Sequence, residues 1–164
     1  TILSAIAALT PPGGAETYMP AGLIWGWNML TSQDPLTRAH SPEFMQQNGG
    51  RRALVLMTDG INSVAPENRS SWRIINANNS TYRNWGPRNT SYTDHLTAQL
   101  CERIKADGID VYTVAFTVDD ADTDTLLRNC ATDPGKFYKA LTPNALFRAF
   151  DDIGDSLKRV RLAQ

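Results

Sequence analysis

Long apolar runs are missing from this 164-residue sequence. The longest apolar stretch, residues 2–9, is interrupted by Ser4 and is far too short to span a bilayer. No secretory signal peptide is visible, and the first residue is Thr1 rather than methionine. We therefore expect a segment that precedes residue 1 in the natural protein to be missing from this sequence.

The motifs of several enzyme classes are also missing. The sequence has no Gly-x-Gly-x-x-Gly or Gly-Lys-Ser/Thr phosphate loop and no Gly-x-Ser-x-Gly nucleophile elbow. His40 and His95 accompany no recognisable nucleophile, so we interpret them as surface or helix-face histidines. The acidic residues 119–125 resemble the start of a calcium loop but lack its glycine and its glutamate. We interpret them as a solvated turn with a helix cap.

Net charge and cysteine are both scarce. A formal net charge of −1 excludes binding to nucleic acid or to a membrane surface that is driven by bulk charge. The only cysteines are Cys101 and Cys130. They are compatible with a disulfide, a metal half-site or two unrelated core thiols, but no histidine or further cysteine stands at zinc spacing beside either one.

Strands and helices are expected to alternate after residue 52. Strands are predicted over residues 53–58, 109–118 and 136–140, where β-branched and aromatic residues gather. Helices are predicted over residues 93–108 and 122–128 and from Pro143 onward. This order predicts an α/β fold with a doubly wound parallel sheet and right-handed crossovers.

The predicted helices carry recognisable apolar faces and caps. An early helix over residues 20–30 has one apolar face, formed by Leu23, Trp27 and Leu30. The helix over 93–108 should bury Leu96, Leu100 and Ile104. The last helix, capped by Thr142, should bury Leu146, Phe150, Ile153, Leu157 and Val160. Asp122 or Thr123 is expected to cap the helix over 122–128. Between the early helix and the first strand we expect a polar loop.

Residues 62–92 form a polar, Asn-rich insertion without a helical or strand period. It is interspersed with aromatic residues, namely Trp72, Tyr82, Trp85 and Tyr92. A loop of this length in a compact domain is usually functional or disordered. The aromatic residues favour a partly ordered, exposed surface.

Asp59 directly follows the apolar strand that ends at Thr58. In open parallel sheets, ligands bind beyond the carboxyl ends of the strands. A carboxylate there suits a hard cation such as Mg²⁺, which prefers an octahedral shell of oxygen atoms. Thr17 offers a hydroxyl from a second loop, and its alternative role is a helix cap ahead of Pro20.

Three stretches, GGAETYMPAGLIWGW, RALVLMTDGIN and LCERIKADGIDVYTVAFTV, resemble the later two-thirds of a von Willebrand factor A (VWA) domain. The resemblance implies a Rossmann-like sheet and a metal-ion-dependent adhesion site (MIDAS) that uses Thr17 and Asp59 to bind Mg²⁺, or Mn²⁺ or Ca²⁺. A finer resemblance, to the TadG-like proteins of bacterial Tad (Flp-type) pilus assembly, is carried by GLIWGWNMLT, TYRNWG, LLRNCAT and RVRLAQ.

The sequence departs from the VWA pattern before residue 52. The Asp-x-Ser-x-Ser turn of the adhesion site and the first three strands have no counterpart. We therefore expect a partial domain with weak or no metal binding. Its predicted organisation is helices and loop over 1–51, strand and metal-site turn over 52–61, insertion over 62–92, and alternating helices and strands over 93–164.

The resemblance implies a non-enzymatic, extracytoplasmic module for protein binding, cell adhesion or pilus assembly in the bacterial envelope. Its parent would be membrane-anchored through an upstream segment, and its protein partner would present a carboxylate to the metal. Candidate contacts to that partner are Trp72, Tyr82 and Trp85, since aromatic residues dominate binding hot spots. An extracytoplasmic location also favours a Cys101–Cys130 disulfide, since both cysteines flank one strand.

Two alternatives remain open. One is a metal-assisted hydrolase with Asp59 as ligand or base, which lacks a visible nucleophile. The other is an intracellular VWA subunit of an ATP-driven machine, which free thiols at Cys101 and Cys130 would favour.

Overall fold

A three-stranded parallel sheet forms the centre of the protein, whose computed structural model describes residues 4, 8, 16–34, 36–63, 65–66, 85–86 and 90–159. The strands are β1 (Arg52–Thr58), β4 (Ile109–Phe116) and β5 (Phe137–Ala140), in the order β1-β4-β5. Both pairings are parallel, which confirms the α/β fold predicted from the alternation of elements.

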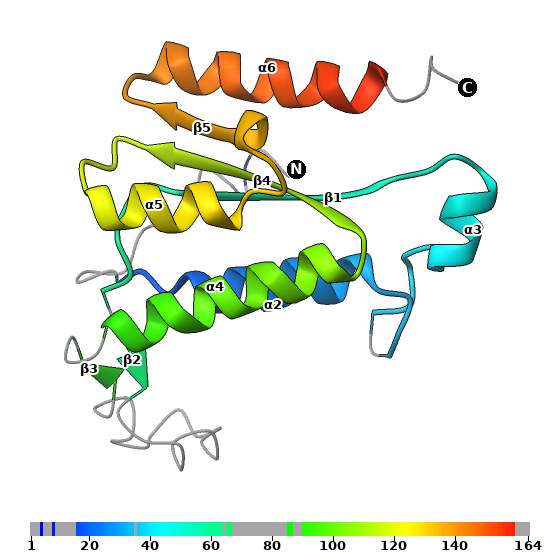
Figure 1. Ribbon diagram of the computed structural model, residues 1–164, viewed down its shortest axis with the longest axis horizontal. Helices are drawn as coiled ribbons and strands as arrows, with labels where there is room; N and C mark the ends of the chain where they lie inside the picture. The colour runs from blue at the N-terminus through cyan, green and yellow to red at the C-terminus, as the bar shows by residue number, and fades with distance from the viewer. Residues whose placement is uncertain are drawn as a thin grey trace.

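Helices cover both faces of this sheet (Figure 1). On one face lie α2 (Met19–Leu30), α4 (Thr90–Ala106) and α5 (Ala121–Cys130), and α6 (Pro143–Arg159) lies on the other. Leu23, Leu54 and Ile104 are among the buried residues of the first layer, and Val114 and Ile153 belong to the second. None of the described helices is both long and apolar enough to cross a membrane.

The buried face of α4 differs from the predicted one. Thr93, Thr97, Cys101 and Ile104 are buried, whereas Leu96 and Leu100 are only half-buried. Burial of a threonine is favourable here because the hydroxyl of Thr97 donates a 2.8 Å hydrogen bond to the Thr93 carbonyl. The apolar periodicity of the sequence could not register this, because both threonines count as polar.

The apolar stripe of α6 is wider than its contact with the sheet. Ala149 and Ile153 are buried, but Phe150 and Leu157 remain 43% and 39% exposed. The prediction that both are buried was therefore wrong. Leu146 is half-buried, and Val160 lies outside the described residues.

Two helix caps were predicted with different success. The Thr142 hydroxyl accepts a hydrogen bond from the Ala145 N–H at 3.2 Å, as expected at the start of α6. At the start of α5, however, Asp120 rather than Asp122 or Thr123 is the cap, and it accepts the Thr123 N–H at 2.7 Å. Hydrogen bonds from Thr123 lower the pKa of Asp120.

Short elements interrupt both regions that were predicted to be loops. Helix α3 (Pro42–Gln47) begins at its cap Ser41, which accepts the Phe44 N–H at 3.2 Å, and it lies at one end of the molecule (Figure 1). In the insertion, β2 (Ala65–Pro66) pairs antiparallel with β3 (Trp85–Gly86). A 3₁₀ turn, η4 (Pro134–Lys136), precedes β5.

Cys101 and Cys130 form a disulfide, which confirms the pairing that the family resemblance implied. Their Cα atoms are 5.1 Å apart, and the bond joins α4 to the last residue of α5. The two cysteines are 0% and 1% exposed, so the disulfide is part of the core that α4 and α5 share.

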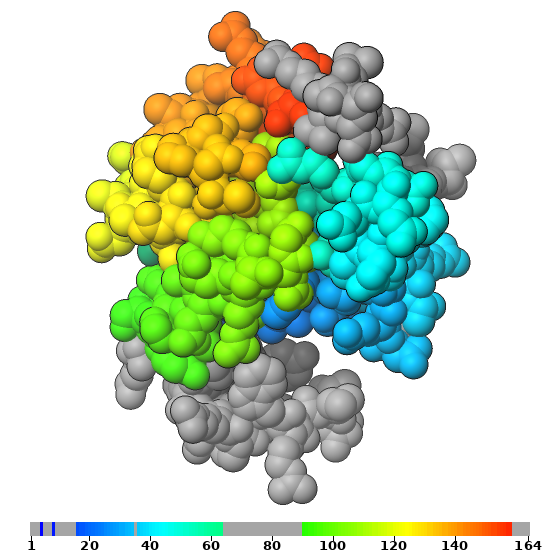
Figure 2. Space-filling model, turned by 45° about the vertical axis from the view of Figure 1, so that its right-hand side comes forward, coloured from blue at the N-terminus to red at the C-terminus, as the bar shows by residue number. Residues whose placement is uncertain are grey.

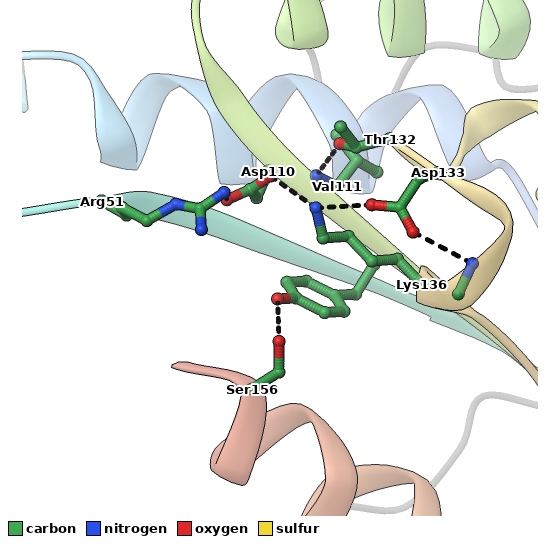
Figure 3. A network of polar contacts seen from close by, with 9 residues as sticks. Arg51, Asp110, Val111, Thr132, Asp133, Lys136 and Ser156 are labelled. Atoms are coloured by element: carbon green, nitrogen blue, oxygen red, sulfur yellow. Dashed lines mark hydrogen bonds and ion pairs between the residues drawn. The ribbon is translucent and has the colours of Figure 1, made fainter. Parts of the chain in front are cut away.

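A polar network lies where β4 begins (Figure 3). Asp110 pairs with Arg51 and, at 2.8 Å, with Lys136. Lys136 also pairs with Asp133 at 2.8 Å. Burial lowers the pKa of Lys136, but the hydrogen bonds and charges of Asp110 and Asp133 outweigh it, so the pKa is raised. The network therefore holds η4 against the start of the central strand.

Candidate functional site

Thr17 and Asp59 line one shallow pocket at the carboxyl end of β1. The pocket has a volume of about 400 Å³, and its wall also includes Glu16, Tyr18 and Thr58. The sequence places these groups on two loops separated by about forty residues, and the fold brings them to the same edge of the sheet. This is the edge at which open parallel sheets bind ligands.

The Thr17 hydroxyl lies directly over the turn that carries Asp59. A Cβ atom added at Gly60 would lie 3.2 Å from the Thr17 Oγ1 atom, so only glycine fits there without displacement. Within the turn, the Thr58 hydroxyl donates to the Gly60 carbonyl at 2.8 Å. The turn is thus closed by its own threonine, and its open side faces Thr17.

Two hydrogen bonds tie the Thr17 backbone to Ser63. The Thr17 N–H donates to the Ser63 hydroxyl oxygen at 2.7 Å, and the Ser63 N–H donates to the Thr17 carbonyl at 3.0 Å. Thr17 is not a helix cap, because the N-cap of α2 is Tyr18, which makes no side-chain capping bond. The alternative role for Thr17 is therefore wrong.

Asn62 connects three elements around the pocket. Its Oδ1 atom accepts the Met19 N–H at 2.9 Å, which satisfies a free donor in the first turn of α2. Its Nδ2 atom donates to Asp94 at 2.7 Å and to the Thr97 hydroxyl at 3.2 Å. Asn62 is 2% exposed. The sequence reasoning missed this residue, although a polar residue that follows a buried strand and a tight turn is a usable signal.

The described residues that line the pocket include acidic side chains and no basic one. Glu16 and Asp59 contribute two carboxylates, and both residues are exposed. Tyr18 is half-buried, and burial, with a smaller contribution from Tyr92, raises the pKa of its phenol. The polar side chains of these lining residues therefore offer oxygen atoms as metal ligands, the type of ligand that Mg²⁺ and Ca²⁺ prefer.

The donor set suits a hard cation only in part. Thr17 and Asp59 would hold such an ion, and Glu16 adds a carboxylate that the sequence reasoning did not select. In the described part of the chain, no cluster of three or more His, Cys, Asp or Glu side chains could hold a metal. Water would have to fill most of an octahedral shell around an ion held by these residues, and the weak binding expected from the sequence stays a prediction.

The predicted partner-contacting aromatic residues are largely outside the structural description. Trp72 and Tyr82 lie beyond the described residues. Trp85 is described only as part of β3, where its backbone pairs with Pro66. Their role in binding a partner therefore stays a prediction.

Comparison with known proteins gives structural matches. No family model and no curated protein sequence matches the chain. The vWF domain of the type V pili tip protein Mfa5 from Porphyromonas gingivalis matches with a TM-score of 0.61 and 16% identity, over 94% of this chain and 71% of that one.

The pilus adhesin SpaC from Lactobacillus rhamnosus GG is a second structural match. Its open conformation gives a TM-score of 0.56 and 15% identity, and a second crystal structure of it gives 0.57 and 18%. Both matches cover 96% of this chain but only 20% of SpaC, so the chain spans about a fifth of that protein's length. At this level of identity the likeness concerns the fold, and the chain has the fold of von Willebrand factor A domains.

Proposed function

We propose that the chain is part of a non-enzymatic adhesion or assembly module that binds a protein partner through the edge formed by Thr17 and Asp59. The observation that carries this proposal is the approach of the Thr17 hydroxyl to the Asp59 turn, 3.2 Å from the Cβ position of Gly60. Two loops fixed to each other at a ligand-binding edge suit recognition. The VWA-fold matches to a pilus tip protein and a pilus adhesin support the same function.

A divalent cation, Mg²⁺ or else Mn²⁺ or Ca²⁺, would occupy the site in the complete domain, with Thr17 and Asp59 among its ligands. When bound, such an ion supplies a positive centre that accepts a partner's carboxylate oxygen. The chain itself supplies the positioning: Ser63 fixes the Thr17 backbone, and Asn62 fixes the turn against α2 and α4.

An extracytoplasmic setting, with the chain belonging to a Tad-type pilus system and anchored through an upstream segment, completes the proposal. The Cys101–Cys130 disulfide supports an oxidising compartment. It also weighs against an intracellular subunit of an ATP-driven machine, which would be expected to keep its thiols free. The GLIWGWNMLT and LLRNCAT stretches are the basis for the finer assignment.

The metal site is tested by paramagnetic broadening of amide NMR signals on addition of Mn²⁺. We expect weak binding, with the Thr17 and Gly60 amides broadened first and with no micromolar site in isothermal titration. Asp59→Ala should remove this broadening. Asp119→Ala, which removes an exposed carboxylate that does not line the pocket, should leave it unchanged. Equal broadening in the wild type and in Asp59→Ala would contradict the assignment.

Partner binding is tested by capture on immobilised chain, with and without a chelator. A partner that the wild type retains should be lost from Asp59→Ala and after removal of divalent ions. Trp72→Ala and Trp85→Ala test whether the insertion reads the partner. Unchanged capture by both tryptophan variants would remove the insertion from the proposal but leave the Thr17–Asp59 edge in place.

A further inference from the structure

Two adjoining pockets at the opposite end of the sheet are lined by basic residues. One has a volume of about 400 Å³ and is lined by Arg38, His40, Arg51 and Arg52 among others. The second, of about 370 Å³, shares Arg51 with the first and adds Lys158. None of the described residues that line either pocket is acidic. The described lining of these pockets is therefore basic, whereas that of the Thr17–Asp59 pocket is acidic, and of the cations Lys158 pairs with Asp155 at 3.2 Å.

Arg52 is held in place by backbone carbonyl groups, which are neutral and do not compensate its positive charge. Its guanidinium donates to the Leu30 carbonyl at 3.5 Å and to the Asp107 carbonyl. The carboxylate of Glu43 on α3 interacts electrostatically with the Arg52 guanidinium. The lowered pKa of Glu43 comes mainly from its own backbone hydrogen bond and from Ser41, with Arg52 the smallest contribution. Arg52 is thus a positioned cation rather than half of an ion pair.

Arg51 is held by an ion pair with Asp110 that does not use all of its N–H donors. Its partner Asp110 is shared with Lys136, so one carboxylate faces two cations (Figure 3). The Arg51 side chain remains 46% exposed. Because a guanidinium carries five N–H donors, several are left to face an anion in the pocket. Arg38 is exposed on the loop before α3 and adds a third guanidinium.

Exposed apolar side chains of α2 and α3 lie near these cations. Met29 lines the first pocket and is 66% exposed, and Trp25, one turn earlier on α2, is 64% exposed. Phe44 is 45% exposed and stacks on His40 with ring centroids 4.2 Å apart. Figure 2 shows the segment that contains α3, in cyan, next to the end of α2, in blue. Cations and protruding apolar groups therefore share one face.

The combination distinguishes between two kinds of anionic partner. An acidic peptide would use the arginines but gain little from a protruding tryptophan and methionine. A lipid surface uses both, because phosphate groups meet the guanidiniums while the apolar side chains enter the region between headgroups and acyl chains. Arginine is also well matched to phosphate, which it binds through two parallel N–H donors.

We propose that this basic end, formed by Trp25, Met29, Arg38, Phe44, Arg51 and Arg52, binds the phosphate groups of an anionic phospholipid surface. The formal net charge of −1 does not oppose this, because salt screens charges beyond about 10 Å and only the nearby cations act on the membrane. The seven residues of β1 separate the two ends by roughly 20 Å. The Thr17–Asp59 edge would then point away from the membrane.

The test is co-sedimentation of the chain with phospholipid vesicles. Vesicles that contain phosphatidylglycerol should retain the chain, and pure phosphatidylcholine vesicles should not. Arg38→Ala should weaken the partition about fivefold, as expected for the loss of one cation near an anionic surface. Trp25→Ala should also weaken it. Arg148→Ala, which removes an exposed cation on α6 that lines neither pocket, is the matched control and should bind like the wild type.

Three results would overturn the proposal. These are equal binding to both kinds of vesicle, equal loss in Arg38→Ala and Arg148→Ala, and capture of a polyglutamate peptide without any vesicle binding. Competition with inorganic phosphate distinguishes a lipid headgroup from a free phosphate ion as the ligand. If a low concentration of inorganic phosphate abolishes vesicle binding, the pockets bind a small anion and the proposal is wrong. Asp59→Ala should retain vesicle binding, so this proposal and the proposed function fail independently. Unchanged thermal unfolding of Arg38→Ala excludes misfolding.

Discussion

Thr17 and Ser63 exchange two backbone-anchored hydrogen bonds across 46 positions of sequence, at 2.7 and 3.0 Å. This exchange fixes the loop before α2 to the turn after β1 by groups that are independent of any bound ion. The relative position of the two candidate ligands is therefore a property of the folded chain. A site arranged in this way is ready for its ligand before the ligand arrives.

Replacement of Asn62 by alanine should destabilise the chain by about 2–3 kcal/mol, because three hydrogen bonds are lost and the Met19 N–H is left unpaired in a buried position. Urea unfolding measures the loss. The control is Asn48→Ala, which removes an exposed side-chain bond to the Phe44 carbonyl. A loss for Asn62→Ala no larger than for this control would show that Asn62 does not hold the site together.

Replacement of Cys101 and Cys130 together by alanine should lower the free energy of unfolding by about 3–4 kcal/mol, because the unfolded chain regains the freedom of a closed loop of about thirty residues. Urea unfolding of the oxidised wild type and the double variant measures the difference. Alkylation of the unreduced wild type should leave its mass unchanged. A mass increase by two alkyl groups would mean that the thiols are free.

Replacement of Asp110 by asparagine should cost about 3 kcal/mol, because Arg51 and Lys136 would then face a neutral amide. This loss of stability is at the low end of the range for breaking a buried ion pair, because the Arg51 side chain is half-exposed. Asp155→Asn removes the exposed partner of Lys158 and should change stability by less than about 0.5 kcal/mol. Similar small losses in both variants would make the network unimportant for folding.

Asp120 should make the stability of the chain depend on pH in the acid range. Its pKa in the folded state is lowered by the bonds from Thr123, so the unfolded state binds the proton more tightly. Its contribution is complete above its ordinary pKa of 3.8 and is lost as pH falls through the lowered value. Asp120→Asn keeps a capping oxygen but does not titrate, so its unfolding free energy should fall less steeply below pH 3.8. Identical slopes would contradict this assignment.

Local sequence patterns predicted the order of the helices and strands, but they did not predict which faces of several helices are buried. Alternating apolar strands and helices predicted the sheet of β1, β4 and β5 because each pattern reports burial within one element. The buried threonines of α4 depend on a hydrogen bond within the helix, which hydropathy does not record. The exposed Phe150 depends on how far the sheet extends beneath α6, which no single element encodes.

The candidate site was predictable only where a motif carried it. Asp59 was selected from its place after a buried strand and Thr17 as a hydroxyl on a second loop, and the family resemblance joined them in one site. The structure brings both into one pocket, while their metal-binding role stays a prediction. Glu16, Asn62 and Ser63 were missed because their role arises from contacts between distant loops. Helix α3 was missed for a local reason, since Ser41 followed by Pro42 is a usable start signal that the flanking prolines and glycines obscured.

The Cys101–Cys130 bond also has a mechanical consequence. A load applied between the ends of the chain passes through this covalent link, so the segment between the cysteines, which includes the whole of β4, carries no tension. Those 29 positions cannot be drawn out, which shortens the extended chain by roughly 100 Å. If the protein is stretched while attached, its central strand stays within a closed loop and is free to re-form its pairing with β1 when the load is released.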